Sequence, residues 1–269
     1  PLLSERWPSI NQTINRSAAH CLEGQALLNE MAEQDLQKGL VLLKNQEEKE
    51  KENGHGLFFL EKAFFAQLPV EPLLEYSVAR FNNLFRYFLS LNGCLMPSSE
   101  QLMQVHKQLS APQDKNPSIK IGDYVIRRYK QLLYLTKDYH DISNWKTVVE
   151  GLNKEQKVSL PESIGSLLIS INTNGSGKEE LSYRGEAEGE TFSFEHLLAP
   201  EKGQVVSIRF AHNNPSCLPD YRQKSRSLKK ILQELNIPPW QRNRIPYLYY
   251  DDVLVAAIGL FVCKPYLIR

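Results

Sequence analysis

The spacing of apolar residues changes near Ser118, and this change limits the fold class of the chain. Between Ser9 and Leu109 many apolar residues recur at steps of three and four, the period of an amphipathic helix. From Ser118 to Leu135 the chain is rich in β-branched and aromatic residues with strand-like alternation. The sequence therefore predicts an α+β protein: a helical first domain with a small β-hairpin unit, then a mixed, strand-rich domain with one basic amphipathic helix.

Three helices are expected in the first domain. One runs from Ser9 to Lys38 and ends at Gly39, because glycine favours a helix stop. The charged run from Asn45 to Gly56 is typical of a loop. The second helix covers Glu71 to Leu91, and the third covers Ser98 to Leu109 with a serine N-cap.

Two domains fit a chain of 269 residues. Residues 139–161 are polar and poorly periodic, so we expect them to link a domain at 1–138 to a second domain at 162–269. Within the first domain, the hairpin lies at about 118–135. The second domain is expected to hold strands at Ser163–Asn172, Leu181–Arg184, Phe192–Glu195 and Val205–Phe210, followed by the amphipathic helix and a terminal hairpin.

Several classes of protein do not fit this chain. No apolar run approaches the roughly 20 residues of a membrane helix, so we expect no membrane partner and a cytoplasmic location. The four cysteines lack the paired spacing of a disulfide framework or a zinc site, and we expect reduced thiols. Because the chain opens on Pro1 rather than Met, we also expect it to be the back part of a longer protein.

No catalytic arrangement is recognisable in the sequence. Asn174-Gly-Ser-Gly-Lys is similar to the end of a phosphate-binding loop, but Asn172 stands where that motif needs glycine, and Glu179 follows the lysine. Asn-Gly between two strands instead predicts a hairpin turn. The six histidines are isolated, and Asp251-Asp252 falls at an expected turn. We therefore predict no catalytic residue, no metal ligand and no cofactor in this chain.

The charge is distributed unevenly along the chain. The net charge is +1, but residues 201–269 hold 11 Lys and Arg against 5 Asp and Glu, whereas the first 200 residues hold 21 against 26. A basic end on a mildly acidic body suggests a polyanionic partner. Ordinary surface variation explains the charges equally well at this point.

The segment from Lys224 to Tyr250 carries the strongest binding signal. An apolar stripe at helical spacing predicts a helix that docks on a core, and its opposite arc is basic. Cations at a helix N-terminus oppose the macrodipole, and a bound phosphate would reverse that effect. The stripe is Leu228, Ile231, Leu232 and Leu235; the predicted binding residues are Arg222, Lys224, Arg226, Lys229, Lys230, Arg242 and Arg244.

Four arginines of the first domain are weaker candidates. Arg80 and Arg86 lie within a broad arc of one expected helix. Arg127 and Arg128 lie in a strand-like stretch beside an aromatic residue, where arginine can bind phosphate and a ring can stack on a base. Helix solubility explains the first pair, and ion pairs within the domain explain the second, at least equally well.

Two groups of motifs resemble one family. Arg226-x-Leu-Lys-Lys-x-x-Gln-Glu-Leu, Ile237-Pro-Pro-Trp-x-Arg, Pro246-x-Leu-Tyr-Tyr and Leu254-Val-Ala-Ala-x-Gly resemble the C-terminal domain of bacterial tRNA(Ile)-lysidine synthases. The middle domain of that family is similar to Pro1-Leu-Leu-x-x-Arg-Trp-Pro, to the helix with Ala79-Arg80 and Phe88-Leu89, and to Gly122 with Ile126-Arg-Arg-Tyr. The resemblance covers nearly the whole chain and is weakest between Asp138 and Glu201.

The resemblance implies a role in tRNA modification. Family members are ATP-dependent ligases that join lysine to the wobble cytidine of an isoleucine tRNA with a CAU anticodon. Their Ser-Gly-Gly-x-Asp-Ser loop is absent from these 269 residues. We expect ATP, Mg²⁺ and lysine to be used by the full-length enzyme, and this chain to be inactive alone. It would bind tRNA, with the C-terminal domain on the acceptor stem and the middle domain nearer the anticodon arm, and it could form a homodimer.

A protein-interaction or general nucleic-acid-binding module remains the alternative at this point. In that case the basic helix would contact an acidic partner or a neighbouring subunit.

Overall fold

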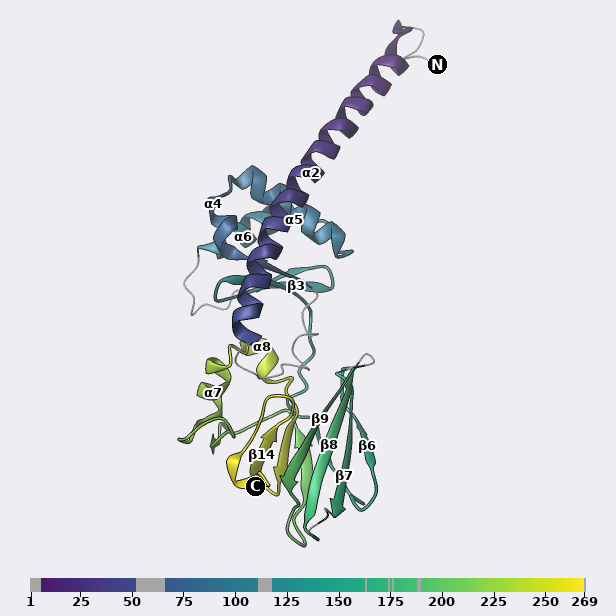
Figure 1. Ribbon diagram of the computed structural model, residues 1–269. Helices are drawn as coiled ribbons and strands as arrows, with labels where there is room; N and C mark the ends of the chain where they lie inside the picture. Colours follow the sequence, from purple (N-terminus) through teal and green to yellow (C-terminus); the bar gives the residue numbers. More distant parts are fainter. Residues whose placement is uncertain are drawn as a thin grey trace. The chain divides into compact units, whose positions relative to one another are not determined.

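The computed structural model describes residues 6–51, 66–110, 118–162, 164–173, 175, 177–187 and 190–268 (Figure 1). The described residues divide into two compact units. Unit 1 holds those up to Asp138, and unit 2 holds those from Tyr139 onward.

The long helix α2 (Ile10–Lys51) starts unit 1. The expected stop at Gly39 is wrong, because this glycine lies within the helix, where a Cβ would stand 3.3 Å from the ring of Pro69. A small residue at that point lets the strand beside it approach closely. Residues 45–51, expected to be a loop, continue the helix, since Glu, Lys and Gln are strong helix formers. The rest of the expected loop, 52–56, lies outside the described residues.

The expected helix over Glu71–Leu91 is two helices, α4 (Val70–Glu75) and α5 (Val78–Leu91). They separate at Ser77, whose side chain accepts a hydrogen bond from the Arg80 N–H and so begins α5. The next helix, α6 (Ser99–Leu109), confirms the predicted Ser98 cap, and it has a full capping box with Gln101.

The hairpin predicted in unit 1 is confirmed, and it belongs to a larger sheet. Four antiparallel strands have the order β1-β4-β3-β2: β1 (Ala66–Pro69), β2 (Ser118–Ile121), β3 (Tyr124–Tyr129) and β4 (Leu132–Lys137). The apolar faces of α5, α6 and this sheet form one core, which includes Phe81, Phe85 and Leu135.

Unit 2 is built on a five-stranded sheet with the order β15-β14-β13-β10-β5. Its strands are β5 (Lys146–Val148), β10 (Val206–Arg209), β13 (Tyr247–Tyr250), β14 (Val253–Ala257) and β15 (Phe261–Val262). The predicted terminal hairpin is confirmed, since β13 and β14 pair around Asp251 and Asp252.

A second, four-stranded antiparallel sheet of unit 2 has the order β6-β7-β8-β9. Its strands are β6 (Gln156–Ser159), β7 (Ser166–Thr173), β8 (Glu179–Ala187) and β9 (Glu190–Leu198). The hairpin expected at Asn174-Gly agrees with the pairing of β7 with β8, although Asn174 itself lies outside the described residues.

Residues 139–161 do not form the expected linker. They contain β5 and β6, and four of their apolar side chains are buried in the core of unit 2. The two strands are only three and four residues long, and the four buried side chains lie outside them, so the segment shows little periodicity in the sequence. The buried residues are Ile142, Val149, Leu152 and Leu160.

The five-stranded sheet lies between two apolar layers. Leu248 and Tyr250 of β13 belong to the layer shared with the four-stranded sheet, where the Tyr250 hydroxyl donates to the carbonyl of Leu198 at 2.8 Å. Tyr247 and Tyr249, on the other face of the strand, belong to the layer that holds α7 (Leu228–Glu234). Around α7 lie β11 (Ser216–Cys217), β12 (Arg226–Ser227), α8 (Pro239–Arg242) and the 3-10 turn η1 (Lys264–Tyr266).

Candidate nucleic-acid interface

The helix α7 docks as its apolar stripe predicts. Leu228, Ile231 and Leu232 are fully buried against the five-stranded sheet, and Leu235 packs partly against the same cluster. Asn236 then adopts the left-handed conformation, with φ of 59°, as expected for a residue that ends a helix. The basic residues begin before the helix does: Arg226 lies in β12, and Lys224 precedes β12. The docking fixes which face of α7 is turned to solvent.

The N-terminus of α7 is capped by a loop from elsewhere in the chain. The N-cap residue, Ser227, makes no side-chain cap. Instead, the N–H of Leu228 donates to the carbonyl of Pro215 at 2.9 Å, and the N–H of Lys229 donates to Oδ1 of Asn214 at 2.8 Å. The expectation that free N–H groups bind phosphate here is therefore wrong for these two groups, which already have partners.

His212 supports this capping loop. Its Nδ1 accepts a hydrogen bond from the backbone N–H of Asn214 at 3.1 Å, so the imidazole is neutral in this arrangement. Burial lowers the pKa of His212, and the positive charge of Arg242 lowers it further. Asn214 itself has φ of 49°, a conformation that asparagine tolerates better than most residues. Sequence reasoning missed both residues, although Asn213-Asn-Pro is a recognisable turn signal.

Glu234 pairs with two of the predicted cations. Its carboxylate forms ion pairs with both Arg222 and Arg226, which approach it from the segment before α7. Their guanidinium groups therefore face an acid on α7 and do not stand free, as the sequence had suggested. The net charge of this trio is +1.

Three lysines leave their charge turned outward. Lys224, Lys229 and Lys230 are exposed, and none forms an ion pair with a carboxylate in the part of the chain that the structure describes. A fourth cation, Lys146 on β5, was not predicted. It is the register partner of Arg209, which in turn pairs with Tyr247. Since cross-strand partners share a face, Lys146 lies on the face of the sheet that carries α7.

Arg242 and Arg244 have structural contacts within unit 2. The Nε of Arg242 donates to the carbonyl of Ile237 at 3.0 Å. Arg244 is 9% exposed, its guanidinium lies 4.2 Å from the ring centre of Tyr139, and burial lowers its pKa. Arg244 is therefore held inside unit 2 and does not extend the basic surface, whereas Arg242 is half-buried.

In unit 1, Arg80 is bound to Asp35. Its Nε and NH2 donate to the two carboxylate oxygens at 2.8 and 2.7 Å, and the guanidinium also lies over the ring of Tyr76. The hydrogen bond and charge of Arg80 lower the pKa of Asp35 against the opposing effect of burial. This bidentate pair joins α5 to α2, so the guanidinium has a structural partner.

The other three predicted arginines of unit 1 differ in exposure. Arg128 is 7% exposed and its NH1 donates to the carbonyl of Gln108 at 2.7 Å, while the Nε of Arg127 donates to Oγ1 of Thr136 at 3.1 Å. The predicted alternation is confirmed, since Arg127 is more exposed than Arg128. Arg86 is exposed on α5 and forms no ion pair with any described residue.

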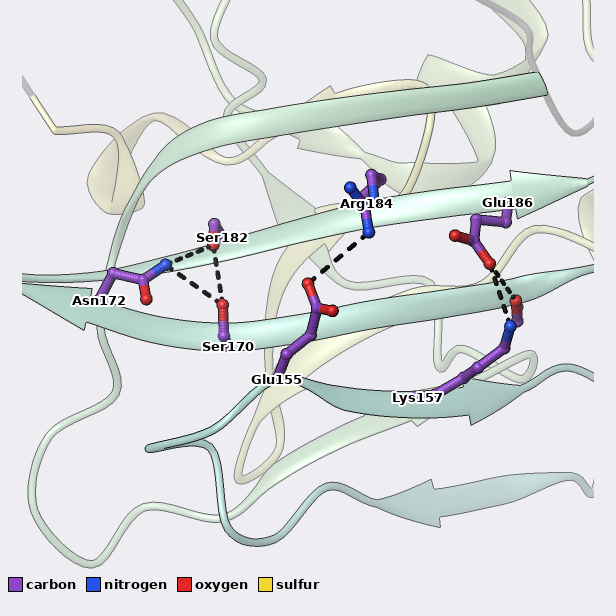
Figure 2. A network of polar contacts seen from close by, with 8 residues as sticks. Glu155, Lys157, Ser170, Asn172, Ser182, Arg184 and Glu186 are labelled. Carbon is purple, nitrogen blue, oxygen red and sulfur yellow. Dashed lines mark hydrogen bonds and ion pairs between the residues drawn. The ribbon is translucent and has the colours of Figure 1, made fainter. Parts of the chain in front are cut away.

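The four-stranded sheet of unit 2 presents a different polar surface (Figure 2). Lys157 contacts Glu186 at 3.1 Å, and Arg184 lies 3.8 Å from Glu155. Farther along the same strands, the hydroxyls of Ser170 and Ser182 are hydrogen-bonded at 3.2 Å, and Figure 2 shows Asn172 reaching both. The labelled charges on this face occur as pairs of opposite sign.

Within the described ranges, no group of three or more His, Cys, Asp or Glu side chains is arranged to hold a metal ion. Among the helices that the structure describes, none is both long and apolar enough to cross a membrane.

Two family models match the chain. Residues 68–134 match the TilS substrate binding domain, and residues 206–268 match the TilS substrate C-terminal domain. The first match covers α4 to α6 and most of the sheet of unit 1. The second covers α7, its capping loop and most of the five-stranded sheet, whereas the four-stranded sheet of Figure 2 lies outside both matches.

Curated relatives match almost the full chain. It is 35% identical over 269 residues to the tRNA(Ile)-lysidine synthase of Photobacterium profundum, with 99% of this chain and 51% of that protein aligned. It is 33% identical over 265 residues to the tRNA(Ile)-lysidine synthase of Serratia proteamaculans, with 98% and 50% aligned. The chain therefore spans about half the length of the curated relatives that it matches.

Proposed function

Because the chain belongs to the tRNA(Ile)-lysidine synthase family, we propose that it is the tRNA-recognition portion of an ATP-dependent ligase. That ligase would join lysine to the wobble cytidine of an isoleucine tRNA with a CAU anticodon.

The outward lysines beside α7 carry this proposal. Lys229 and Lys230 are held on a rigid helix whose other face is buried, and Lys224 stands just ahead of them. Lysines without carboxylate partners bind phosphates by direct charge attraction and release counterions from the nucleic acid. They are exposed around the start of one helix, and the acceptor stem of the tRNA is the duplex that we assign to them.

Unit 1 contributes a smaller basic surface. Arg86 is its exposed candidate, and Arg127 is the more accessible member of the β3 pair. We assign this unit to the region of the tRNA nearer the anticodon arm. The buried contacts of Arg80 and Arg128 give these two residues the role of holding the unit together.

The cofactors of the reaction are assigned to another part of the complete enzyme. The described residues contain no metal-ligand cluster, and the sequence lacks a matching nucleotide-phosphate loop. We therefore expect ATP, Mg²⁺ and lysine to be bound by the part of such a ligase that lies outside these 269 residues. We also expect this chain alone to bind tRNA without modifying it, and homodimer formation is a further possibility for the complete enzyme.

A charge-reversal experiment tests the α7 assignment. The double variant Lys229→Glu/Lys230→Glu is compared with Lys154→Glu/Lys202→Glu, which reverses two exposed lysines elsewhere in unit 2. Binding of the isoleucine tRNA is measured by fluorescence anisotropy over a series of salt concentrations. We expect the α7 variant to bind more weakly and to flatten the log–log salt slope by up to about 1.8, since each duplex phosphate contact contributes about 0.9.

The control variant should change the affinity much less. If both double variants weaken binding equally, net charge drives the interaction and the α7 assignment fails. An unchanged affinity in the α7 variant would contradict it directly. Competition by heparin as effective as that by unlabelled tRNA would instead favour a general polyanion-binding surface.

A further inference from the structure

Two cysteines distant in sequence lie on adjacent antiparallel segments beneath α7. Pro219 and Cys263 form an isolated antiparallel bridge. On either side of it, the N–H of Asp220 donates to the carbonyl of Val262 at 2.9 Å, and the N–H of Lys264 donates to the carbonyl of Leu218 at 2.7 Å. Because side chains alternate along an extended segment, Cys217 points to the same side as Pro219 and therefore to the side of Cys263.

The two thiols are buried and in contact. Cys217 is 7% exposed and Cys263 is 3% exposed, and both belong to the apolar cluster that contains Leu228 and Ile231 of α7. A hydrogen bond joins their side chains, which lowers the pKa of Cys217 and, together with burial, raises that of Cys263. Cys217 is therefore the thiol that loses its proton first, and Cys263 is the donor that stabilises the resulting thiolate.

We propose that Cys217 and Cys263 form a reactive dithiol that is converted to an intramolecular disulfide by low-molecular-weight disulfides. The reaction is a thiol–disulfide exchange in two steps. The Cys217 thiolate attacks one sulfur of the oxidised reagent, forming a mixed disulfide and releasing one reagent thiolate. Cys263 then loses its proton and attacks the sulfur of Cys217, which releases the second reagent thiol. The two cysteines are oxidised, and the reagent disulfide is reduced to two thiols.

Access to this dithiol requires a local opening of the segment after Cys217. Ser216 and Asp220 are exposed, and Tyr221 is 38% exposed, so the outer side of this segment already faces solvent. The pairing of this segment with β12 extends over two residues, Ser216 and Cys217, and short ladders of this kind open at low free energy. The reaction is therefore expected to be slower than that of an exposed thiol but to end in the internal disulfide.

The other two cysteines lack such a partner. Cys21 is exposed on α2, and Cys94 is buried in unit 1, where burial raises its pKa and its Sγ contacts the carbonyl of Asn92 at 3.7 Å. These residues serve as internal controls. Cys21 can form a mixed disulfide with the reagent, but no described thiol lies beside it to resolve that bond.

The disulfide would stiffen the support of the basic face. Cys217 is the register partner of Arg226 in the β11–β12 ribbon, which leads directly into α7. Joining Cys217 to Cys263 ties this ribbon to the end of β15. This consequence rests on the proposed function, because it concerns how firmly Lys229 and Lys230 are presented to tRNA.

The test counts thiols and needs no tRNA. The full chain is incubated with oxidised glutathione under native conditions, quenched in acid, alkylated and digested, and its peptides are identified by mass spectrometry. We expect one internal disulfide between the peptides of Cys217 and Cys263, with a loss of two hydrogen atoms (about 2 Da) from the protein. The variants Cys217→Ser and Cys263→Ser should not show this loss, and Cys263→Ser should instead hold a stable glutathione adduct on Cys217.

Two outcomes would overturn the proposal. In the first, Cys217 and Cys263 are both still fully alkylated at a time when Cys21 has been completely converted to its glutathione adduct. The other is an internal loss of about 2 Da that persists in Cys263→Ser, because the disulfide would then involve another pair. Circular dichroism spectra of each variant establish that it is folded. A protein that forms the disulfide but does not bind tRNA would support the dithiol and contradict only the proposed function.

Discussion

The two polar surfaces of unit 2 distribute their charges in opposite ways. On the outer face of the four-stranded sheet, Lys157 faces Glu186, and Arg184 faces Glu155 (Figure 2). Beside α7, one carboxylate, Glu234, holds two arginines, while the lysines of the helix have no acidic partner among the described residues. The first surface neutralises itself across its strands. The second retains a surplus of positive charge directed at solvent.

This difference in pairing decides how strongly each surface attracts a polyanion, more than the number of cations does. In an ion pair at about 3 Å, the two opposite charges largely cancel at longer range. Such a pair therefore attracts a distant charged ligand only weakly. A lysine without a partner presents its full charge, and several on one face attract a polyanion over roughly a Debye length of about 10 Å at 0.1 M salt. The basic composition of residues 201–269 therefore becomes informative only once the paired arginines are separated from the unpaired lysines.

The largest expected effect comes from the docking of α7. Leu232→Ala should lower the free energy of unfolding by about 2–5 kcal/mol, because it leaves a cavity beneath the helix. The matched change on the other surface is Leu168→Ala, at a half-buried position on the outer side of β7, where the loss should be at most about 1 kcal/mol. Urea denaturation measures both. Equal losses would mean that α7 is not docked as described.

The next effect concerns the cap of α7. Asn214→Gly keeps the left-handed backbone but removes the side-chain acceptor of the Lys229 N–H. Relative to the control Asn213→Gly, it should cost about 0.5–1.5 kcal/mol, the net contribution of a typical hydrogen bond. It should also weaken tRNA binding, since Lys229 lies in the first turn. A stable protein with unchanged affinity would show that the loop does not position this face.

Local patterns predicted much of this surface, and distant contacts accounted for what they missed. The stripe of Leu228, Ile231 and Leu232 is readable because neighbouring turns of one helix decide it. The Asn214 cap comes from a residue 15 positions away, and the Asp35–Arg80 pair spans 45 positions. Sequence periodicity contains no information on such partners. For that reason the stripe was predicted, whereas the capping and pairing were not.

The same reason explains the errors in the fold. Gly39 stands where local rules place a helix stop, but its close packing on Pro69 is a tertiary contact. Strands of three and four residues, such as β5 and β6, are too short to show a period. Their identity depends on pairing partners elsewhere in the chain, which composition does not reveal.

A smaller effect, on the salt dependence of tRNA binding, is expected when an arginine or lysine loses its acidic partner. Glu234→Gln removes the carboxylate shared by Arg222 and Arg226. The freed cations should steepen the log–log salt slope of tRNA binding by up to about 0.9 each. The control Glu186→Gln frees Lys157 on the sheet face and should leave the slope unchanged. If Glu186→Gln steepens the slope as much, the sheet face also contacts tRNA and the contrast between the surfaces disappears.

The smallest effect is a pH dependence confined to the sheet face. The hydrogen bond and charge of Lys157 lower the pKa of Glu186. A carboxyl group whose pKa is lower in the folded state stabilises the protein above its unfolded pKa, about 4.3 for glutamate, and this contribution is lost as the pH falls through the folded value. Thermal midpoints of the wild type and Glu186→Gln should therefore differ at pH 7 and converge in acid.

Lys157→Gln should converge in the same way, because it breaks the same pair. Replacing Lys229 and Lys230 with Gln should leave the acid limb unaltered, since neither lysine forms an ion pair with a described carboxylate. Convergence with that variant as well would show that the α7 lysines are paired in solution, and the difference between the two surfaces would then be wrong.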